Sequence, residues 1–342
     1  MSEQTQKQQT GQQRTAYFIM LLAVILFVVT GLVCPFFGGH FLNVKEIIQA
    51  FSGNITPDGE IFLMHRVPRV ILGLLAGGSL AVTGAVFQVV LRNPLAEPFT
   101  LGTTGGAALG AVVAISVPGL WLSWGPFSSV QLLALAGAGT TLSLIYVMAR
   151  SRNGLSMSVL LLAGVTLSIF CASLVLLVRY LMNPDLLVQV DRWMMGGLEI
   201  VGYRELAALL PFLVPGLGLL FYIAMPLNHL ALGEDMARGH GVNVSSVQKT
   251  SFVAGGLTTG AIVSLTGPIS FIGLIIPHVV RRLIGYDQRM VLPMSFLFGG
   301  IALTICDAVA RTLAAPSEMP VGIVTALIGC PVFIWILCAK RA

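Results

Sequence analysis

Charged residues are scarce in this chain of 342 residues: Lys, Arg, Asp and Glu make up 10% of it, whereas soluble domains carry roughly 25%. Hydrophobic residues make up 56%, and the mean hydropathy is +0.90. The formal net charge is +5, but the charges gather in the connections between apolar runs. This balance implies no nucleic-acid partner and indicates a membrane protein that crosses the lipid several times.

Cysteine pairs, metal-ligand patterns and nucleotide-binding signatures are also missing. The five cysteines stand singly in or beside apolar segments without a CxxC pair, so we interpret them as small packing residues. The five histidines show no metal-ligand spacing, and no GxxxxGK[ST] motif occurs. We therefore expect no metal site, no cofactor and no ATPase site in this chain, and we do not expect it to be an enzyme by itself.

Apolar segments of ~17–25 residues, long enough to cross a bilayer as helices, dominate what remains. We predict ten of them, at roughly 17–37, 66–91, 97–116, 128–149, 155–181, 204–225, 247–266, 268–284, 290–312 and 320–338. The polar residues 1–16 are expected to form a cytoplasmic N-terminal tail, and residues 17–342 a single transmembrane domain. The fold class is therefore all-α and polytopic.

The distribution of Lys and Arg predicts the orientation. With ten spans, both termini lie on the same side. An inner N-terminus leaves seven basic residues outside and the other twelve inside, as the positive-inside rule favours. The outer seven are Lys45, Arg66, Arg69, Arg179, Arg192, Arg204 and Arg311. We expect both termini to be cytoplasmic.

A weak internal repeat is visible. The motifs Ala76-Gly77-Gly78 and Gly84-Ala85 are echoed by Ala254-Gly255-Gly256 and Gly260-Ala261. In the predicted topology the two copies enter the membrane from opposite sides. Such inverted repeats are typical of transporters whose path runs between two halves.

Two features frame the second span. Arg66 and Arg69 are three positions apart and so share one helix face at its outer end, where Pro68 suits a first helical turn. A short turn beginning at Asn93-Pro94 closes the inner end. This pattern suits a docking point at one mouth of a membrane protein and a gate-like turn at the other.

Asp307 is the one acid well inside a predicted span. A membrane-embedded acid is by default a functional candidate. Arg311 lies one turn further on, however, and an i,i+4 pair is the simpler interpretation.

The connection from Pro226 to Lys249 is the longest inner one, and it predicts a short amphipathic helix. Glu234 stands near its start, Arg238 near its end, and Gly241 would stop it, as the helix dipole and C-terminal capping favour. The residues alone leave two roles open: an interfacial helix, or a knob that enters a partner's cleft.

Several of these motifs, in this order, resemble the FecCD family, the membrane subunits of type II ABC importers for iron–siderophores, haem and cobalamin. The resemblance covers roughly residues 15–340. It rests on Arg66-Val67-Pro68-Arg69, Asn93-Pro94-Leu95-Ala96-Glu97-Pro98, Leu232-Gly233-Glu234, Gly267-Pro268-Ile269, residues 271–278, Asp307 to Thr312 and residues 320–325.

The resemblance implies functional residues by their match to the family's motifs. Arg66, Arg69 and Arg311 match outer arginines that meet acids of a binding protein. Asn93, Pro94 and Leu95 match an inner gate, and Ser156 and Ser158 lie at a second constriction, although Met157 stands where a small hydroxyl residue is common. The segment that resembles the coupling helix includes Leu227, Asn228, Leu232, Gly233, Glu234, Ala237, Gly241 and Val242.

The resemblance also implies partners and a mechanism. The expected assembly has two ATPase subunits that bind ATP and Mg²⁺, a substrate-binding protein, and a second permease copy or a sister permease in the cytoplasmic membrane of a prokaryote. Import by alternating access is expected for an iron–siderophore or similar metal chelate, with haem or cobalamin as alternatives. An ion-coupled secondary transporter is less favoured, because it would need more intramembrane acids than Asp307.

Overall fold

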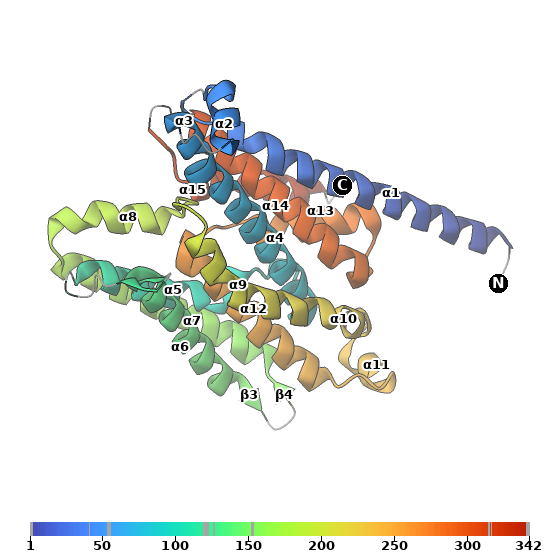
Figure 1. The fold of residues 1–342 in the computed structure, drawn as a ribbon. Coiled ribbons are helices and arrows are strands. Elements are labelled where there is room, and N and C mark those ends of the chain that lie inside the picture. Colours follow the sequence, from blue (N-terminus) through green and yellow to red (C-terminus); the bar gives the residue numbers. More distant parts are fainter. Residues whose placement is uncertain are drawn as a thin grey trace.

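Helices make up most of the described chain, and Figure 1 shows the long ones packed together. The computed structural model describes residues 3–40, 42–52, 56–117, 119, 123–125, 127–151, 154–313, 315 and 317–339. Each of the ten predicted apolar segments coincides with a helix. These helices are α1 (Glu3–Val33), α4 (Val67–Val90), α5 (Thr103–Ser116), α6 (Ser129–Ala149), α7 (Met157–Leu181), α9 (Arg204–Tyr222), α12 (Val244–Thr266), α13 (Ile272–Ile284), α14 (Gln288–Leu313) and α15 (Val321–Ala339).

Six helical stretches among the described residues are long and apolar enough to cross a membrane, by length and composition. They are Phe18–Phe36, Pro57–Val90, Ser129–Ala149, Met157–Leu181, Arg204–Tyr222 and Gln288–Leu313. Thr103–Ser116 and Val321–Ile336 are apolar but shorter. Helix α12 has 23 residues but carries many Ser, Thr and Gly, which lower its hydropathy. Neighbouring helices bury most of its side chains, so few of them would contact lipid and have to be apolar for that reason. The protein is an all-α polytopic membrane protein, and ten crossings remain a prediction.

Shorter elements, which a search for membrane spans does not detect, connect the long helices. The helical ones are η1 (Cys34–Phe36), α2 (Val44–Phe51), α3 (Pro57–Glu60), the π-helical turn η2 (Ile61–Arg66), η3 (Pro98–Leu101), η5 (Pro184–Leu186), α8 (Leu187–Met195), α10 (Ala224–Ala231) and α11 (Glu234–Gly239). The strands form two small antiparallel hairpins, β1 (Ser123–Trp124) with β2 (Phe127–Ser128) and β3 (Arg150–Ser151) with β4 (Gly154–Leu155).

Helix α4 lies at the centre of the bundle, and nearly all of its side chains are buried. It packs closely against α14, because Gly77 and Gly299 face each other and a methyl group on either would overlap the other's main chain. Gly106 on α5 and Gly137 on α6 make the same kind of contact. The small residues found in the sequence thus allow close helix packing, as is usual in lipid.

Helices α4 and α12 lie side by side and run in opposite directions. Arg66 precedes one end of α4 and Asn93 follows the other, so we call these ends of the bundle the Arg66 end and the Asn93 end. The segment that leads into α12 meets the chain just after α4, since Glu234 stands 4.0 Å from Arg92. This antiparallel arrangement is what the predicted inverted repeat requires.

The sequence predicts a polar cytoplasmic N-terminal tail at residues 1–16, and that prediction stays open. In the structure, helix α1 already begins at Glu3 and runs without a break into the apolar part, and its N-terminal half extends away from the other helices (Figure 1). Hydropathy marks where lipid contact can begin, whereas Gln, Glu and Lys are themselves good helix formers. The sequence therefore placed the boundary of the apolar segment and not the start of the helix.

Candidate functional site

The three arginines predicted as docking residues come together at the Arg66 end. Arg69 on α4 lies against Asp307 on α14, with its Nε and Nη2 at 3.0 and 2.9 Å from Asp307 Oδ1. Arg311, one helical turn after Asp307, places its Nε 3.0 Å from Asp307 Oδ2. The predicted i,i+4 pair is confirmed, and the same carboxylate also joins α14 to α4.

A second acid completes this group. Arg69 Nη1 donates to Glu318, which lies in the connection between α14 and α15. The side chain of Glu318 is 43% exposed, whereas that of Asp307 is 1% exposed. We call Arg66, Arg69, Asp307, Arg311 and Glu318 the arginine cluster. It holds three cations and two anions, so one positive charge is in excess.

Arg66 obtains its hydrogen bonds from the main chain. Its Nη1 donates to the carbonyl oxygens of Pro35 and Phe36 at 3.3 and 3.2 Å, and Arg311 Nη1 donates to that of Phe37 at 2.9 Å. These carbonyls follow α1, and the end of a helix leaves such oxygens without partners inside the helix. A guanidinium group suits this place because its donors meet the negative end of the helix dipole.

The sequence predicted that Arg66 and Arg69 would present their charges at a membrane surface. In this single chain they are only 7% and 8% exposed, and Arg311 is 2% exposed. Asp307, Glu318 and the carbonyls after α1 turn the guanidinium groups inward, and none of these partners is near in sequence to Arg66 and Arg69. The docking role itself stays a prediction.

Local sequence explains how Arg66 and Arg69 are held. Pro68 has no N–H, so the carbonyl oxygen of Met64 has no partner four residues on. Gly202 N donates to that oxygen at 2.6 Å, and Tyr203 Oη donates to Leu63 O at 3.0 Å. The helix accommodates Pro68 by widening into the π-helical turn η2 just before α4, and the chain near Gly202 stabilises this turn.

A concavity adjoins the arginine cluster, and its lining includes residues that sequence reasoning missed. Besides Arg66, Arg69, Arg311 and Glu318, it is lined by His40, His65, Arg192 and Glu199. Arg192 pairs with Glu199 at 3.3 Å. No motif could have identified these residues, because elements far apart in the sequence bring them together.

The predicted gate turn follows α4 directly and is well ordered by its own hydrogen bonds. Asn93 Oδ1 accepts a hydrogen bond from Leu95 N at 2.9 Å, and Asn93 O accepts one from Ala96 N at 3.0 Å. Such an Asx turn is a common use of Asn. Pro94 and Leu95 are exposed. The short turn read from the sequence is therefore present, and its gate role stays a prediction.

The second predicted constriction lies beside the first. Ser156 N donates to Ala149 O at 2.9 Å after the β3–β4 hairpin, and Ser158 is exposed in the first turn of α7. Leu91 and Ala96, which flank the predicted gate residues, belong to one buried apolar cluster with Leu155 and Leu160, which flank the two serines. The structure thus brings the two predicted gate segments together at the Asn93 end.

The segment predicted as one coupling helix forms two. Helix α10 ends at Ala231 and α11 begins at Glu234, because Gly233 between them has a φ of +123°, which only glycine adopts readily. Gly241, with a φ of +78°, follows α11 as predicted. The short helix that the charge pattern predicts from Glu234 to before Gly241 is confirmed as α11, and α10 is an additional helix at the start of the segment that resembles the coupling helix.

Helices α10 and α11, which form the predicted coupling segment, bury one face and expose another. Leu227, Leu230 and Ala237 are fully or almost fully buried, whereas Leu232 and Met236 are 66% and 56% exposed. These two apolar side chains lie beside charged ones and are accessible to a partner in this single chain. Asn228, Gly233, Glu234 and Val242 are partly buried, and Gly241 is exposed.

Glu234 connects the predicted coupling segment to its surroundings. Its Oε1 accepts a hydrogen bond from Gln248 on α12 at 3.2 Å and stands 4.0 Å from Arg92 Nη2, while its Oε2 lies 3.4 Å from Arg238 Nη2. Arg92 directly precedes Asn93 of the gate turn. The predicted gate and the predicted coupling segment are therefore neighbours, although more than a hundred residues separate them.

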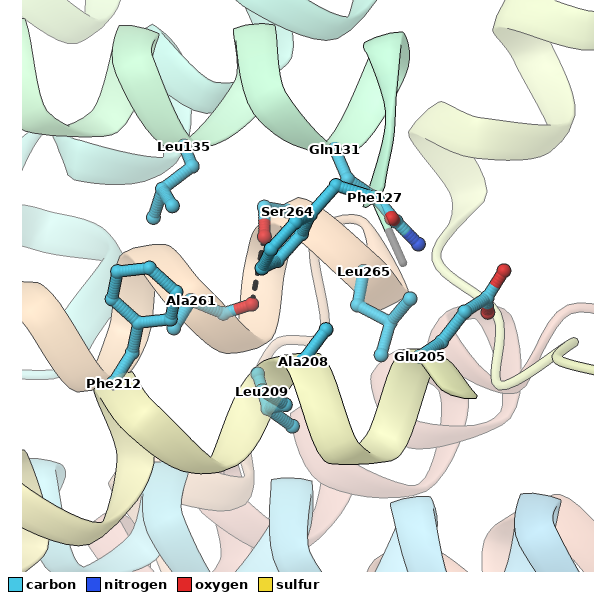
Figure 2. A pocket seen from close by; sticks show the side chains of 10 residues that line it. All are labelled: Phe127, Gln131, Leu135, Glu205, Ala208, Leu209, Phe212, Ala261, Ser264 and Leu265. Atoms are coloured by element: carbon cyan, nitrogen blue, oxygen red, sulfur yellow. Dashed lines mark hydrogen bonds between the residues drawn. The ribbon is translucent and has the colours of Figure 1, made fainter. Parts of the chain in front are cut away.

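A further pocket lies between α6, α9 and α12 (Figure 2). Phe127 and Phe212 meet edge to face in it, with ring centroids 6.3 Å apart, and Glu205 lies at one side. Ser264 uses its hydroxyl to donate to Ala261 O at 2.8 Å within its own helix. The pocket contains none of the predicted site residues and is mostly apolar.

Comparisons with known proteins extend over nearly the whole chain. Residues 21–339 match the model of the FecCD transport family. An uncharacterized ABC transporter permease protein, YvrB of Bacillus subtilis, is 36% identical over 332 residues, which cover 94% of this chain and 93% of that protein. The vitamin B12 import system permease protein BtuC of Escherichia coli is 40% identical over 287 residues, covering 84% of this chain and 86% of BtuC.

A solved structure is similar as well. It is described as an inward-facing conformation of a metal-chelate type ABC transporter. It superposes with a TM-score of 0.79 at 27% sequence identity, covering 95% of this chain and 99% of that chain. The arrangement of helices described above is therefore that of an ABC transporter permease.

Proposed function

This chain belongs to the FecCD transport family, and we propose that it is the permease subunit of a binding-protein-dependent ABC importer for a large metal chelate. The observation that carries this proposal is the separation of its sites. The arginine cluster lies at one end of α4, while the predicted gate turn and coupling helices lie together at the other. A subunit with a binding protein on one side of the membrane and ATPases on the other needs this arrangement.

The partners follow from this role. Two ATPase subunits would contact the exposed Leu232 and Met236 face of the coupling helices at the cytoplasmic side. A substrate-binding protein would dock at the outer side, and a second permease copy or a sister permease would complete the path. The protein would then lie in the inner membrane, with both termini on the cytoplasmic side. The positive excess of the arginine cluster supports docking of a partner that presents carboxylates.

Transport would proceed by alternating access, with energy from the partner ATPases. ATP-driven movement of α10 and α11 would reach the turn at Asn93-Pro94-Leu95 and the segment Ser156–Ser158. Residues that flank these two segments share one buried apolar cluster. The chain itself would hydrolyse no ATP, since it carries no P-loop motif.

For the substrate, we propose cobalamin, a cobalt chelate, as the first candidate and an iron–siderophore or haem as the others. Relatives at about 40% identity that are named as vitamin B12 import permeases support the first. The likeness to a metal-chelate type transporter supports the class as a whole.

The test is uptake into proteoliposomes that contain this chain with its partner ATPase and binding protein. Cyanocobalamin, a ferric siderophore and haem are offered separately and then in competition. We expect ATP-dependent uptake that needs all subunits, with cyanocobalamin as the strongest competitor. Uptake by this chain alone, driven by an ion gradient, would overturn the proposal in favour of a secondary transporter. Competition by a siderophore or haem alone would reassign the substrate.

A further inference from the structure

Gln88, in the last turn of α4, makes three contacts that reach different parts of the molecule. Its side chain is almost fully buried at 5% exposure. Its main-chain oxygen accepts a hydrogen bond from Asn93 N at 3.2 Å, at the start of the gate turn. Its side-chain Nε2 donates to Leu274 O on α13 at 3.1 Å, and its Oε1 accepts from Arg281 Nη1. One residue therefore joins the gate turn to both halves of α13.

The side-chain amide of Gln88 lies where helix α13 lacks a main-chain hydrogen-bond donor. Pro277 has no N–H, so the carbonyl oxygen of Gly273 lacks its partner within the helix. Gln88 Nε2 lies 3.5 Å from that oxygen and closer to the next one. Gly84 of α4 touches Gly273 so closely that a side chain at either position would overlap the other helix, and Pro98, after the gate turn, packs on Gly273 as well. Helix α13 is thus held against both sides of the turn.

Arg281 strengthens the same connection. Its Nη2 donates to Ala85 O at 3.0 Å, while its Nη1 binds Gln88. Within the described part of the chain, no carboxylate lies at ion-pair distance from Arg281. Its charge therefore depends on neutral acceptors near the C-terminal end of α4, where the helix dipole favours a cation. Since a partly buried charge without acceptors is costly, this contact resists separation of α13 from α4.

The far end of α13 is tied to the coupling helices. Asn228 on α10 donates from Nδ2 to Asp287 Oδ1 at 2.7 Å and accepts at Oδ1 from Gln288 N at 2.7 Å. Asp287 and Gln288 lie in the short connection that follows α13 and begins α14. A displacement of α10 must move this connection or break two hydrogen bonds.

We propose that Gln88 and Arg281 are positioning residues that transmit movement of α10, through α13, to the gate turn at Asn93. The proposal rests on the proposed function of this chain as an importer permease. In this arrangement the chain of contacts runs from Asn228 to Asp287, along α13 to Arg281, and through Gln88 to Asn93. It is separate from the weaker contact of Glu234 with Arg92, whose side chains are both substantially exposed.

The test uses the complete complex with its ATPases and binding protein, in a background without the five native cysteines, with Leu95→Cys as a reporter. Leu95 is 46% exposed, so a cysteine there can react with a membrane-impermeant maleimide.

Gln88→Met keeps the length of the side chain and removes both its hydrogen bonds. We expect complex assembly and ATP hydrolysis within about twofold of the parent, but about tenfold less substrate imported per ATP, the size expected for losing a hydrogen bond to a charged group. The change in labelling of the Leu95→Cys reporter on ATP addition should disappear.

Two further variants separate transmission from folding. Gln88→Glu keeps an acceptor for Arg281 and should retain most of the labelling change. Gln131→Leu removes a half-buried glutamine that caps α6, and this control variant should keep the full labelling change. In a double-mutant cycle, Arg281→Leu added to Gln88→Met should cause little further loss, since both remove one connection.

Distinct results bear on the two proposals. If the wild-type complex imports substrate and the Gln88→Met variant shows the same import and the same labelling change, the role of Gln88 and Arg281 is overturned. Additive effects of the two substitutions would overturn it as well. A wild-type complex that imports no chelate at all would contradict the proposed function instead.

Discussion

Arg69 and Asp307, 238 positions apart in the chain, form a buried two-contact ion pair that joins α4 to α14. Asp307 also holds Arg311, so one carboxylate balances two cations in the bundle. Glu318 contacts the outer edge of Arg69 and is much more exposed than Asp307. The two acids of the arginine cluster therefore have different roles: Asp307 maintains the fold, and Glu318 covers a cation that a partner could use.

Asp307→Asn should destabilise the protein strongly. Two buried guanidinium groups would lose their anion, and breaking a buried ion pair in this way costs about 3–5 kcal/mol. The measurement is the thermal unfolding midpoint of the purified chain in detergent. Asp185→Asn is the matched control, because Asp185 is exposed and lies outside the cluster. Equal midpoints for the two variants would show that Asp307 is not needed for the fold.

Glu318→Gln should accelerate association of the binding protein. The substitution raises the excess charge of the arginine cluster from one to two and frees the outer edge of Arg69, and charge complementarity acts mainly on the association rate. We expect a rise of about twofold to tenfold at low ionic strength that shrinks at high salt. Stopped-flow or surface-based kinetics with the cognate binding protein measure it. Asp185→Asn makes the same change in net charge elsewhere, and an equal acceleration by that variant would argue against docking at the cluster.

Reversing the charge of two arginines is a second test of the proposed docking surface. Arg66→Glu with Arg69→Glu should slow association of the binding protein and reduce its salt dependence. Because both residues are buried, we also expect a lower unfolding midpoint, so association must be compared with the Asp307→Asn variant. Loss of stability with unchanged association would mean that these arginines only hold α1 and α14 against α4.

Gly233→Ala should impair coupling to the ATPases. The backbone at Gly233 has a φ of +123° and a ψ of +153°, a region where a side chain costs of order 1–3 kcal/mol. Helix α11 should therefore change direction relative to α10, lowering transport and the yield of ATPase in co-purification. Gly239→Ala is the control: Gly239 is the last residue of α11, has open space around it and no positive φ, so this variant should behave as the wild type. A normal Gly233→Ala complex would contradict the coupling role.

Asn93→Ala should loosen the gate turn. It removes the acceptor for Leu95 N, whereas Asn93→Asp retains an acceptor oxygen at the same place. In vesicles that contain the complex without ATP, we expect faster passive leak of a small fluorescent solute through the alanine variant and little change with aspartate. Identical leak in all three proteins would show that this turn does not close the path.

The sequence determined those features of the protein that depend on short-range chemistry. The apolar segments matched ten helices because lipid and protein interiors both select apolar side chains along a whole helix. The turn at Asn93 and the pair of Asp307 with Arg311 were predicted because their partners lie within four residues. The helical start of α1 at Glu3 and the separate helix α10 were not predicted, since hydropathy and charge pattern do not report every helix end.

Only the tertiary structure decided which distant groups meet. Nothing local to Arg69 indicates Asp307, nothing local to Arg66 indicates the carbonyls after α1, and nothing local to Gln88 indicates Arg281. A buried guanidinium or amide must find hydrogen-bond partners wherever the packed backbones place them. In this bundle the close approach of α4 to α13 and α14 at glycines sets those positions. Packing between segments that are distant in the sequence therefore turned the arginines inward and connected the gate turn to α13.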